Sequence, residues 1–361
     1  MKKIISLILA VTMLASVMLF AVGCNSTSDD NSDGGDTTNT TQVVTDMKGN
    51  KVTVPTEVKR YVVLWKSFAT VVALLDSCNG LAAVDYDQSK ASDAWLYEIC
   101  PNAKNATKAS ESMTAEEIIA LDVDVVFWQS PKCEELASQL IDLGVPAVNV
   151  DYTDYESMKQ SISLTAQVLN TQYAKDMAAK YNAELDATLA EIKAQTDKIA
   201  DEDKVSIINL RTLETLRADG KDTVADTWIY ACGAKNLVSE KNLAGNQYLT
   251  SEQFFEWDPD FIISSAVGDD TTLLTDETYA SLTAVKNKNV YTNPQGIFWW
   301  NRYSVETILQ LKWATSILYP EMFKDVDMHV EAKEFYKEFF NYDISDEDID
   351  NMLAAAAPAD K

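Results

Sequence analysis

The chain has 361 residues, enough for two domains with cores of their own. Its formal net charge is -26 and it contains no basic run, which excludes binding to nucleic acid or to an anionic membrane surface. The single histidine, His329, rules out a His-rich zinc or manganese site and weighs against a Ser-His-Asp or Cys-His device. The sequence also lacks GxSxG, HExxH and a Gly-rich phosphate loop, so we expect no enzyme.

The first 42 residues predict export and attachment. Two lysines precede an apolar stretch from Ile4 to Val22, which is typical of a signal peptide over residues 1–23. The site ending at Cys24 resembles a bacterial lipobox, with Ala21 in place of the usual leucine. We therefore expect Cys24 to be lipidated, with a plain membrane anchor as the alternative. Residues 24–42 then form a lipidated cysteine and a polar, disordered tether to the outer face of the cell membrane.

Residues 43–170 predict an N-terminal α/β lobe. A hairpin is expected from Val43 to Pro55, and short apolar strands then alternate with helices, the pattern of a parallel sheet covered on both faces. The expected strands are Tyr61–Leu64, Leu81–Val84, Val123–Phe127 and Ala147–Val150, and the expected helices are Phe68–Leu75, Ala94–Ile99, Lys132–Leu143 and Glu156–Leu169.

Residues 171–199 predict one long helix. The segment Gln172–Lys198 holds no Gly or Pro, and Thr171 offers an N-cap. At 1.5 Å per residue the helix is about 40 Å long, more than one α/β crossover needs. We interpret it as a rigid strut between two lobes, with a surface helix of a single domain as the alternative. Its apolar face is expected to consist of Tyr173, Met177, Tyr181, Leu185, Leu189 and Ile192.

Residues 200–361 predict a second α/β lobe. Its expected strands are Val205–Leu210, Phe261–Ser264 and Val290–Thr292, with a hairpin over Thr212–Gly220. Its expected helices are Asp226–Cys232, Ser251–Phe255, Ser304–Leu318 and Val330–Phe340.

The two lobes repeat one fourteen-residue pattern. Thr114–Phe127 and Thr250–Ile263 both read T-x-E, two apolar residues, then D-x-D and a strand. The threonines are natural N-caps, and Glu116 and Glu252 fall in the first helical turn, where the helix dipole favours an acid. Lobes built on the same unit predict two similar α/β domains that face each other across a cleft.

An ordered set of segments resembles the substrate-binding lipoproteins of bacterial ABC importers for iron complexes and vitamin B12. The set comprises VVTDMKGNKVTVPTEVKRYVVL, the paired T-x-E units, IYACGAKN and FWWNRYSVETILQLKWATSILYPEMF, and the resemblance covers Val43 to about Leu353. It implies two α/β lobes with mostly parallel sheets, joined by one long rigid helix, with ligand in the cleft and little closure. It also implies a permease with its ATPase as partners, docked by Glu116 and Glu252; a capping role is the alternative for these two acids.

Candidate ligand contacts follow the ends of the expected strands, where parallel α/β sheets bind ligands. Only four of the 30 basic residues are arginines, and Arg211, Arg217 and Arg302 stand beside predicted cleft loops. Arginine suits carboxylate or phosphate contacts, although a surface salt bridge is an alternative for Arg211. The predicted ligand-binding residues are Trp65, Lys66, Tyr86, Trp128, Gln129, Arg217, Trp228, Phe298, Trp299, Trp300 and Arg302.

These observations predict an extracytoplasmic binding protein that delivers a ferric siderophore or haem to an ABC importer, without a cofactor or a resident metal. A cobalamin-binding component of the same importer class is the alternative. A secreted enzyme is less favoured, and so is a binder of oxyanions or hard cations. The four cysteines after Cys24 are far apart and form no CxxC, so we expect free thiols or at most one incidental disulfide.

Overall fold

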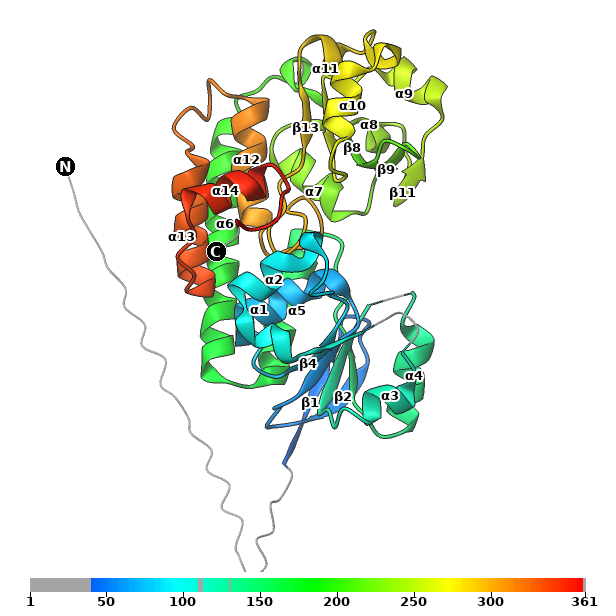
Figure 1. Ribbon diagram of the computed structural model, residues 1–361, viewed down its shortest axis with the longest axis vertical. Coiled ribbons are helices and arrows are strands. Elements are labelled where there is room, and N and C mark those ends of the chain that lie inside the picture. Colours follow the sequence, from blue (N-terminus) through cyan, green and yellow to red (C-terminus); the bar gives the residue numbers. More distant parts are fainter. Residues whose placement is uncertain (1–39, 110–112, 130, 360–361) are drawn as a thin grey trace, which may run out of the picture. The chain divides into compact units, whose positions relative to one another are not determined.

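Three β-sheets, one of them a two-stranded hairpin, and their helices make up the part of the chain that the computed structural model describes, residues 40–109, 113–129 and 131–359 (Figure 1). Residues 39–361 group into one compact unit. The predicted α/β class with two lobes is confirmed. The predicted signal peptide, Cys24 and the tether up to residue 39 lie outside the described residues. Within the described ranges, no helix has both the length and the apolar character needed to cross a membrane.

An antiparallel hairpin comes first, with strands β1 (Thr41–Thr45) and β2 (Lys51–Pro55). Thr41 pairs with Pro55 and Gln42 pairs with Val54, so these two residues belong to the fold and not to the predicted tether. The Gln42 side chain also donates to the carbonyl of Gln167 at 3.0 Å, which ties the hairpin to helix α5.

The N-terminal lobe contains a five-stranded, all-parallel sheet of order β5-β4-β3-β6-β7. The chain runs outward from β3 on one side and then returns to its other side, so the crevice beyond β3 and β6 lies at a topological switch point. The strands are β3 (Tyr61–Val63), β4 (Leu81–Val84), β5 (Thr107–Lys108), β6 (Val125–Trp128) and β7 (Ala147–Asn149), and the helices are α1 (Ala69–Asp76), α2 (Ala94–Ile99), α3 (Ala115–Ile119), α4 (Glu134–Asp142) and α5 (Tyr155–Leu169).

The C-terminal lobe contains a sheet of order β11-β9-β8-β12-β13, with β10 also paired to β8. Strands β10 and β12 both pair in parallel with β8, and β13 pairs in parallel with β12. Strand β9 pairs antiparallel with β8, and β11 pairs antiparallel with β9. The strands are β8 (Ser206–Thr212), β9 (Arg217–Asp219), β10 (Lys235–Asn236), β11 (Asn246–Tyr248), β12 (Phe261–Ser264) and β13 (Val290–Thr292).

The helices of this lobe are α7 (Val224–Ala231), α8 (Leu237–Glu240), α9 (Ser251–Trp257), α10 (Asp269–Thr275), α11 (Thr283–Lys286), α12 (Thr307–Leu318), α13 (Met328–Phe340) and α14 (Asp346–Leu353). Short 3-10 turns occur at Lys66–Phe68, Ala91–Asp93, Pro101–Asn105, Asp201–Asp203 and Glu277–Tyr279.

Helix α6 (Gln172–Thr196) joins the two lobes over 25 residues, as predicted (Figure 1). It packs against α1 and α5 on one side of the junction and against α7 and α12 on the other. The Thr171 hydroxyl caps it by accepting from the amide of Ala174 at 3.1 Å. The predicted apolar face is wrong at its first turn: Tyr173 is 49% exposed and Ala174 is buried instead. Only two residues separate α5 from α6, so the first turn of α6 lies close to the end of α5, and there the small side chain of Ala174 is the buried one.

One hydrophobic core runs through both lobes. Alternate residues of the central strands face it, including Tyr61 and Val63 of β3 and Phe261 and Ile263 of β12, and α6 crosses between them. Two smaller clusters lie on the outer faces of the two sheets. The lobes therefore share buried surface along α6, which resists their separation.

Four tyrosine side chains fasten residues 297–307 of the C-terminal lobe to the rest of the molecule. Three hydroxyls donate to carbonyl oxygens at 2.8 Å, and the fourth bonds a threonine hydroxyl at 2.9 Å. Burial raises the pKa of all four tyrosines, so their hydroxyls remain protonated. The pairs are Tyr86 with Ile297, Tyr152 with Tyr303, Tyr181 with Val305, and Tyr155 with Thr307.

We predict that Tyr181→Phe lowers the free energy of unfolding by about 1–3 kcal/mol, because the buried carbonyl of Val305 loses its donor. Urea denaturation measures the change. Tyr173→Phe, on the exposed first turn of the same helix, is the control and should have no effect. Equal losses in the two variants would contradict a stabilising role for the hydrogen bond from Tyr181 to Val305.

Candidate functional site

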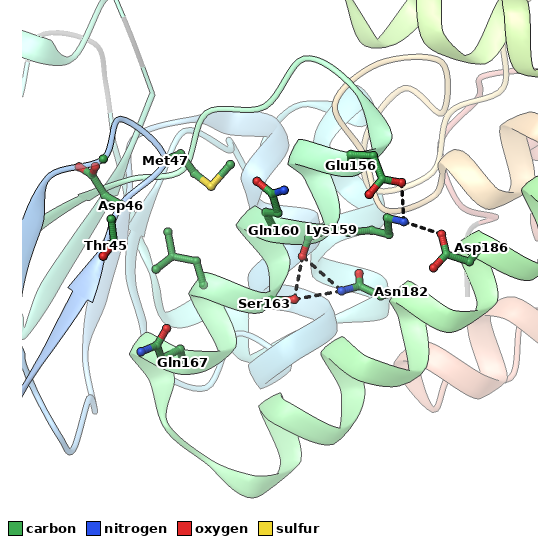
Figure 2. A pocket seen from close by; sticks show the side chains of 12 residues that line it. Thr45, Asp46, Met47, Glu156, Lys159, Gln160, Ser163, Gln167, Asn182 and Asp186 are labelled. Carbon is green, nitrogen blue, oxygen red and sulfur yellow. Dashed lines mark hydrogen bonds and ion pairs between the residues drawn. The ribbon is translucent and has the colours of Figure 1, made fainter.

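Two large hollows mark the surface of the described residues. One, of about 680 Å³, is a groove between the β1–β2 hairpin and helices α5 and α6 (Figure 2). Its cation, Lys159, lies between Glu156 at 2.7 Å and Asp186 at 2.5 Å, so its charge is already balanced. The groove lies between helix faces and the turn of an antiparallel hairpin, and not at the carboxyl ends of the parallel strands. We therefore take the other hollow as the candidate site.

The second hollow, of about 610 Å³, is a cleft between the lobes at the carboxyl ends of the parallel strands. Residues that follow β3, β4, β5 and β6 form one wall. The other wall is formed by the end of β8, the first residues of β9 and β11, and the loop after β13. The first wall consists of Leu64, Trp65, Lys66, Ser67, Asp85, Ser92, Asp93, Ala109, Gln129, Pro131, Lys132 and Cys133, and the second consists of Arg211, Arg217, Asn246, Gln295, Ile297, Phe298, Trp299, Arg302 and Tyr303.

The walls are cationic although the protein is strongly acidic. Five of the charged side chains that line the cleft are Lys or Arg and two are Asp, whereas the whole chain has a net charge of -26. A cleft of one sign with low-dielectric walls concentrates its field on what enters. The arrangement therefore attracts an anion.

Asp219 anchors the arginines of the second wall. This fully buried carboxylate accepts from Arg211 Nε at 2.8 Å, Asn209 at 2.8 Å and Asn246 at 2.6 Å. The Asn246 side chain in turn accepts from Arg217 Nη2 at 2.7 Å. The network fixes the positions of two guanidinium groups but balances only one of their charges.

Arg302 carries a charge that no neighbouring carboxylate compensates among the described residues. Within the described residues, no carboxylate lies at ion-pair distance from it, and its Nε is buried without an acceptor. Burial, with Arg211 nearby, lowers the pKa of Arg302 to about 10, so it is charged at neutral pH. Arg217 Nε is likewise buried without an acceptor. Buried N–H donors of Arg217 and Arg302 that lack an acceptor favour binding of an anion, which would accept hydrogen bonds from both.

Aromatic rings form the floor between the walls. Trp65 packs against Tyr152 and Tyr303, with ring centroids 5.0 and 5.1 Å apart, so the floor joins both lobes. The Arg302 guanidinium lies 5.2 Å from the centre of the Phe298 ring, a cation–π arrangement. On the first wall, Lys66 bonds Asp93 at 2.7 Å.

Comparison with known proteins accounts for this architecture. The profile of the family described as periplasmic binding protein matches residues 75–296, more than half of the chain. The chain belongs to the periplasmic binding protein family. Proteins of this family lie outside the cytoplasm and are the solute-binding components of ABC transporters. The homologues found by these comparisons are solute-binding proteins.

Three relatives show how far the similarity of this periplasmic binding protein extends. The molybdate-binding protein MolA of Haemophilus influenzae is 25% identical over 327 residues, 83% of this chain and 91% of MolA. Its molybdate-bound structure has a TM-score of 0.75 and 21% identity, covering 84% of this chain and 99% of that one. A periplasmic solute binding protein from Veillonella parvula has a TM-score of 0.73 and 25% identity, and the match covers 87% of this chain and 97% of that one. The heme binding protein HmuT has a TM-score of 0.60 and 19% identity, and the match covers 81% of this chain and 96% of that one.

Seven of the eleven predicted ligand-binding residues lie on the cleft walls: Trp65, Lys66, Gln129, Arg217, Phe298, Trp299 and Arg302. The structure does not place Tyr86, Trp128, Trp228 or Trp300 there, since all four are buried. Tyr86 lies behind Lys66, whose ammonium is 4.7 Å from the centre of its ring.

The three buried tryptophans correct the prediction for a simple reason. Trp128 is the last residue of β6, and the two-residue period of a strand turns it onto the α3–α4 face, so Gln129 is the first residue at the strand end. Trp228 faces the core from α7. Trp300 follows Trp299 in a tight loop and points to the opposite side.

Other wall residues were not among the predicted ligand contacts, although Ser67 and Asp85 also follow expected strands. Arg211 is both the salt-bridged residue considered from the sequence and a cleft residue. Asn246 and Asp93 come from segments with no recognisable motif. Tyr303 lies within the NRYS segment but carries no pattern of its own.

Glu116 and Glu252 occupy equivalent places in the two lobes. Both are exposed in the first turn of a short helix, α3 or α9. Thr114 and Thr250 form matching capping boxes with Glu117 and Gln253. The repeated unit read from the sequence therefore has the same local structure in both lobes.

We predict that Asp219→Asn lowers the free energy of unfolding by about 3 kcal/mol, because it leaves the largely buried Arg211 without its counter-charge. Thermal and urea unfolding measure the loss. Asp186→Asn, at a more exposed ion pair, is the control and should change stability little. A small loss at Asp219 would mean that Arg211 is balanced in another way.

Proposed function

We propose that this periplasmic binding protein captures an anionic solute in the cleft between its lobes and delivers it to the permease of an ABC importer. The observation that carries the proposal is the pair of buried, unsatisfied Nε atoms of Arg217 and Arg302. A bound anion satisfies both donors and neutralises the excess positive charge of the walls.

The first candidate is an anionic iron chelate, a ferric siderophore or haem. The cleft volume of about 610 Å³ falls within the range of small-molecule sites, and Trp65, Phe298 and Trp299 offer faces for a ring-bearing ligand. Acidic groups of such a chelate would then meet the guanidinium groups. A corrinoid is the alternative within the same importer class.

The second candidate is a small tetrahedral oxyanion. It is favoured by the three arginines of one wall, and it is supported by the similarity to MolA, which binds molybdate. A dianion of this size would contact the arginines without needing the aromatic floor. The two candidates differ in whether Trp65 and Trp299 take part.

A ligand panel separates the candidates. Thermal unfolding is measured with a ferric catecholate siderophore, haemin, cyanocobalamin, sodium molybdate and, as the control oxyanion, sodium sulfate. A ligand present at about 100 times its dissociation constant adds about 2.7 kcal/mol of stability. Cyanocobalamin has no net charge, so stabilisation by it alone would contradict an anionic solute and favour the corrinoid.

We predict that Arg302→Ala weakens binding of the stabilising compound at least tenfold. Loss of a buried, charge-assisted partner costs about 2–5 kcal/mol of binding free energy. Quenching of tryptophan fluorescence measures the affinity. Arg60→Ala, which removes the one arginine outside the cleft, is the matched control. Equal affinities for Arg302→Ala and the wild type would make Arg302 a structural residue.

We propose that Glu116 and Glu252 dock the permease, because the two lobes expose an acid at the same point of the same unit. Glu116→Lys with Glu252→Lys is expected to abolish uptake of the solute by cells and to leave its affinity unchanged. Glu334→Lys, also exposed, is the charge-reversal control. Persistent uptake, or affinity that falls in parallel, would refute the docking role.

We also propose that Cys24 bears the lipid that anchors the protein. Metabolic labelling with palmitate is expected to label the wild type and Cys133→Ala but not Cys24→Ala. Labelling of Cys24→Ala at the level of the wild type would contradict lipidation at Cys24.

A further inference from the structure

We propose that Glu306 is a positioning residue of the cleft, whose buried carboxylate holds the loop 295–305 in the conformation that presents Phe298, Trp299 and Arg302. The loop's conformation is a property of the protein by itself. Only the consequence for anion binding rests on the function proposed above.

Glu306 is completely buried and each of its oxygens accepts two hydrogen bonds. Oε1 accepts from the amide of Ile297 at 2.8 Å and from the Tyr336 hydroxyl at 2.5 Å. Oε2 accepts from the amide of Phe298 at 3.0 Å and from the Ser304 hydroxyl at 2.8 Å. One carboxylate therefore joins the beginning of the loop to its end.

A carboxylate in this place is costly, which argues that its acceptors are needed. Within the described residues, no Lys, Arg or His lies at ion-pair distance from Glu306. Burial raises its pKa, and the four donors oppose that shift. An apolar residue would avoid the desolvation cost of a buried charge but would leave two backbone amides without acceptors.

Gly296 is shaped to the same carboxylate. A Cβ atom at this position would lie 1.9 Å from Glu306 Oε1 and 2.3 Å from the Tyr336 hydroxyl. No side chain fits there, so the backbone can pass directly over the two oxygens. The residue types at positions 296 and 306 therefore depend on each other.

The turn that carries Arg302 lies inside the loop that Glu306 closes. The Arg302 amide donates to the Trp299 carbonyl at 3.2 Å, and the Ser304 amide donates to the Arg302 carbonyl at 2.7 Å. Release of Ile297, Phe298 and Ser304 would free both ends of this turn. The guanidinium would then lose its fixed place in the cleft.

The carboxylate and the tyrosines divide the loop between them. Tyr86, Tyr152 and Tyr181 hold carbonyl oxygens of residues 297, 303 and 305, whereas Glu306 holds amides of residues 297 and 298. Ile297 is therefore hydrogen-bonded at both its amide and its carbonyl. The tyrosine hydroxyls act as donors to the loop, whereas Glu306 supplies the acceptors for the amides of residues 297 and 298.

Hydrogen exchange followed by mass spectrometry tests the assignment on the unliganded full-length protein. In Glu306→Gln, the amide group faces two donors with hydrogens of its own, so the amides of residues 296–303 are expected to exchange at least tenfold faster than in the wild type. Peptides from β8 and β12 should exchange as before, and the melting temperature should change little because a buried charge is also removed. Glu334→Gln, on the exposed face of α13, is the matched control.

Ser304→Ala guards against a failure of Glu306→Gln to fold. It removes one of the four donors and leaves the carboxylate in place, so the loop is expected to exchange faster than in the wild type but more slowly than in Glu306→Gln. Unchanged loop exchange in Ser304→Ala, or in Glu306→Gln where it folds, would overturn the proposal. Faster exchange in β8 and β12 to the same degree would also overturn it, because Glu306 would then support the whole fold.

A titration with sodium molybdate, followed by tryptophan fluorescence, connects the loop to binding. Glu306→Gln is expected to bind molybdate at least tenfold more weakly than the wild type, and Glu334→Gln should bind it equally well. Equal binding by Glu306→Gln despite a loosened loop would overturn the link from Glu306 to the cleft. If the wild type itself does not bind molybdate, the oxyanion candidate fails, while hydrogen exchange still decides the role of Glu306.

Discussion

Four buried tyrosine hydroxyls hold one loop of the C-terminal lobe against the N-terminal lobe and the long helix, and the rest of the site depends on this attachment. The loop carries six of the nine residues of one cleft wall, yet its carbonyls at residues 297 and 303 bond to the opposite lobe. Because the lobes also share one hydrophobic core along α6, the two walls keep a fixed spacing. A ligand therefore meets a largely preformed cleft. Binding does not have to order the cleft walls, so little of the binding free energy is lost to their conformational entropy.

The electrostatics of the cleft follow from burial more than from the number of charges. Asp219 balances Arg211 and positions Arg217 through Asn246, while Arg302 has a partly buried guanidinium, with its Nε buried, beside other cations. In a chain with a net charge of -26, such a concentration of positive charge persists only where neighbouring packing prevents the arginines from reaching surface carboxylates. The same exclusion of water strengthens their attraction for an anion.

The family relationship and the site chemistry answer different questions. The match over residues 75–296 establishes a periplasmic binding protein, and relatives with the same fold include a molybdate-binding and a heme binding protein. One scaffold thus presents different solutes, so the ligand must be argued from the residues at the strand ends. Here those residues are arginines, an acid-paired lysine and a few aromatic rings, which point to an anion and leave its size to experiment.

The sequence by itself determined the elements whose signals are local. Helix α6 follows from an uninterrupted helical period, the hairpin from its turn residues, and the paired capping boxes from their T-x-E pattern. It also singled out Arg302, Arg217, Trp65 and Trp299, because residues after strand ends in parallel sheets share one edge. Only the tertiary structure decided that Trp128, Trp228 and Trp300 face the core, that Tyr173 is exposed, and that Glu306 closes the cleft loop. Those outcomes depend on contacts between elements that are distant in sequence. Such contacts decide which of two neighbouring side chains is buried and which finds a hydrogen-bond partner, and local periodicity does not encode that choice.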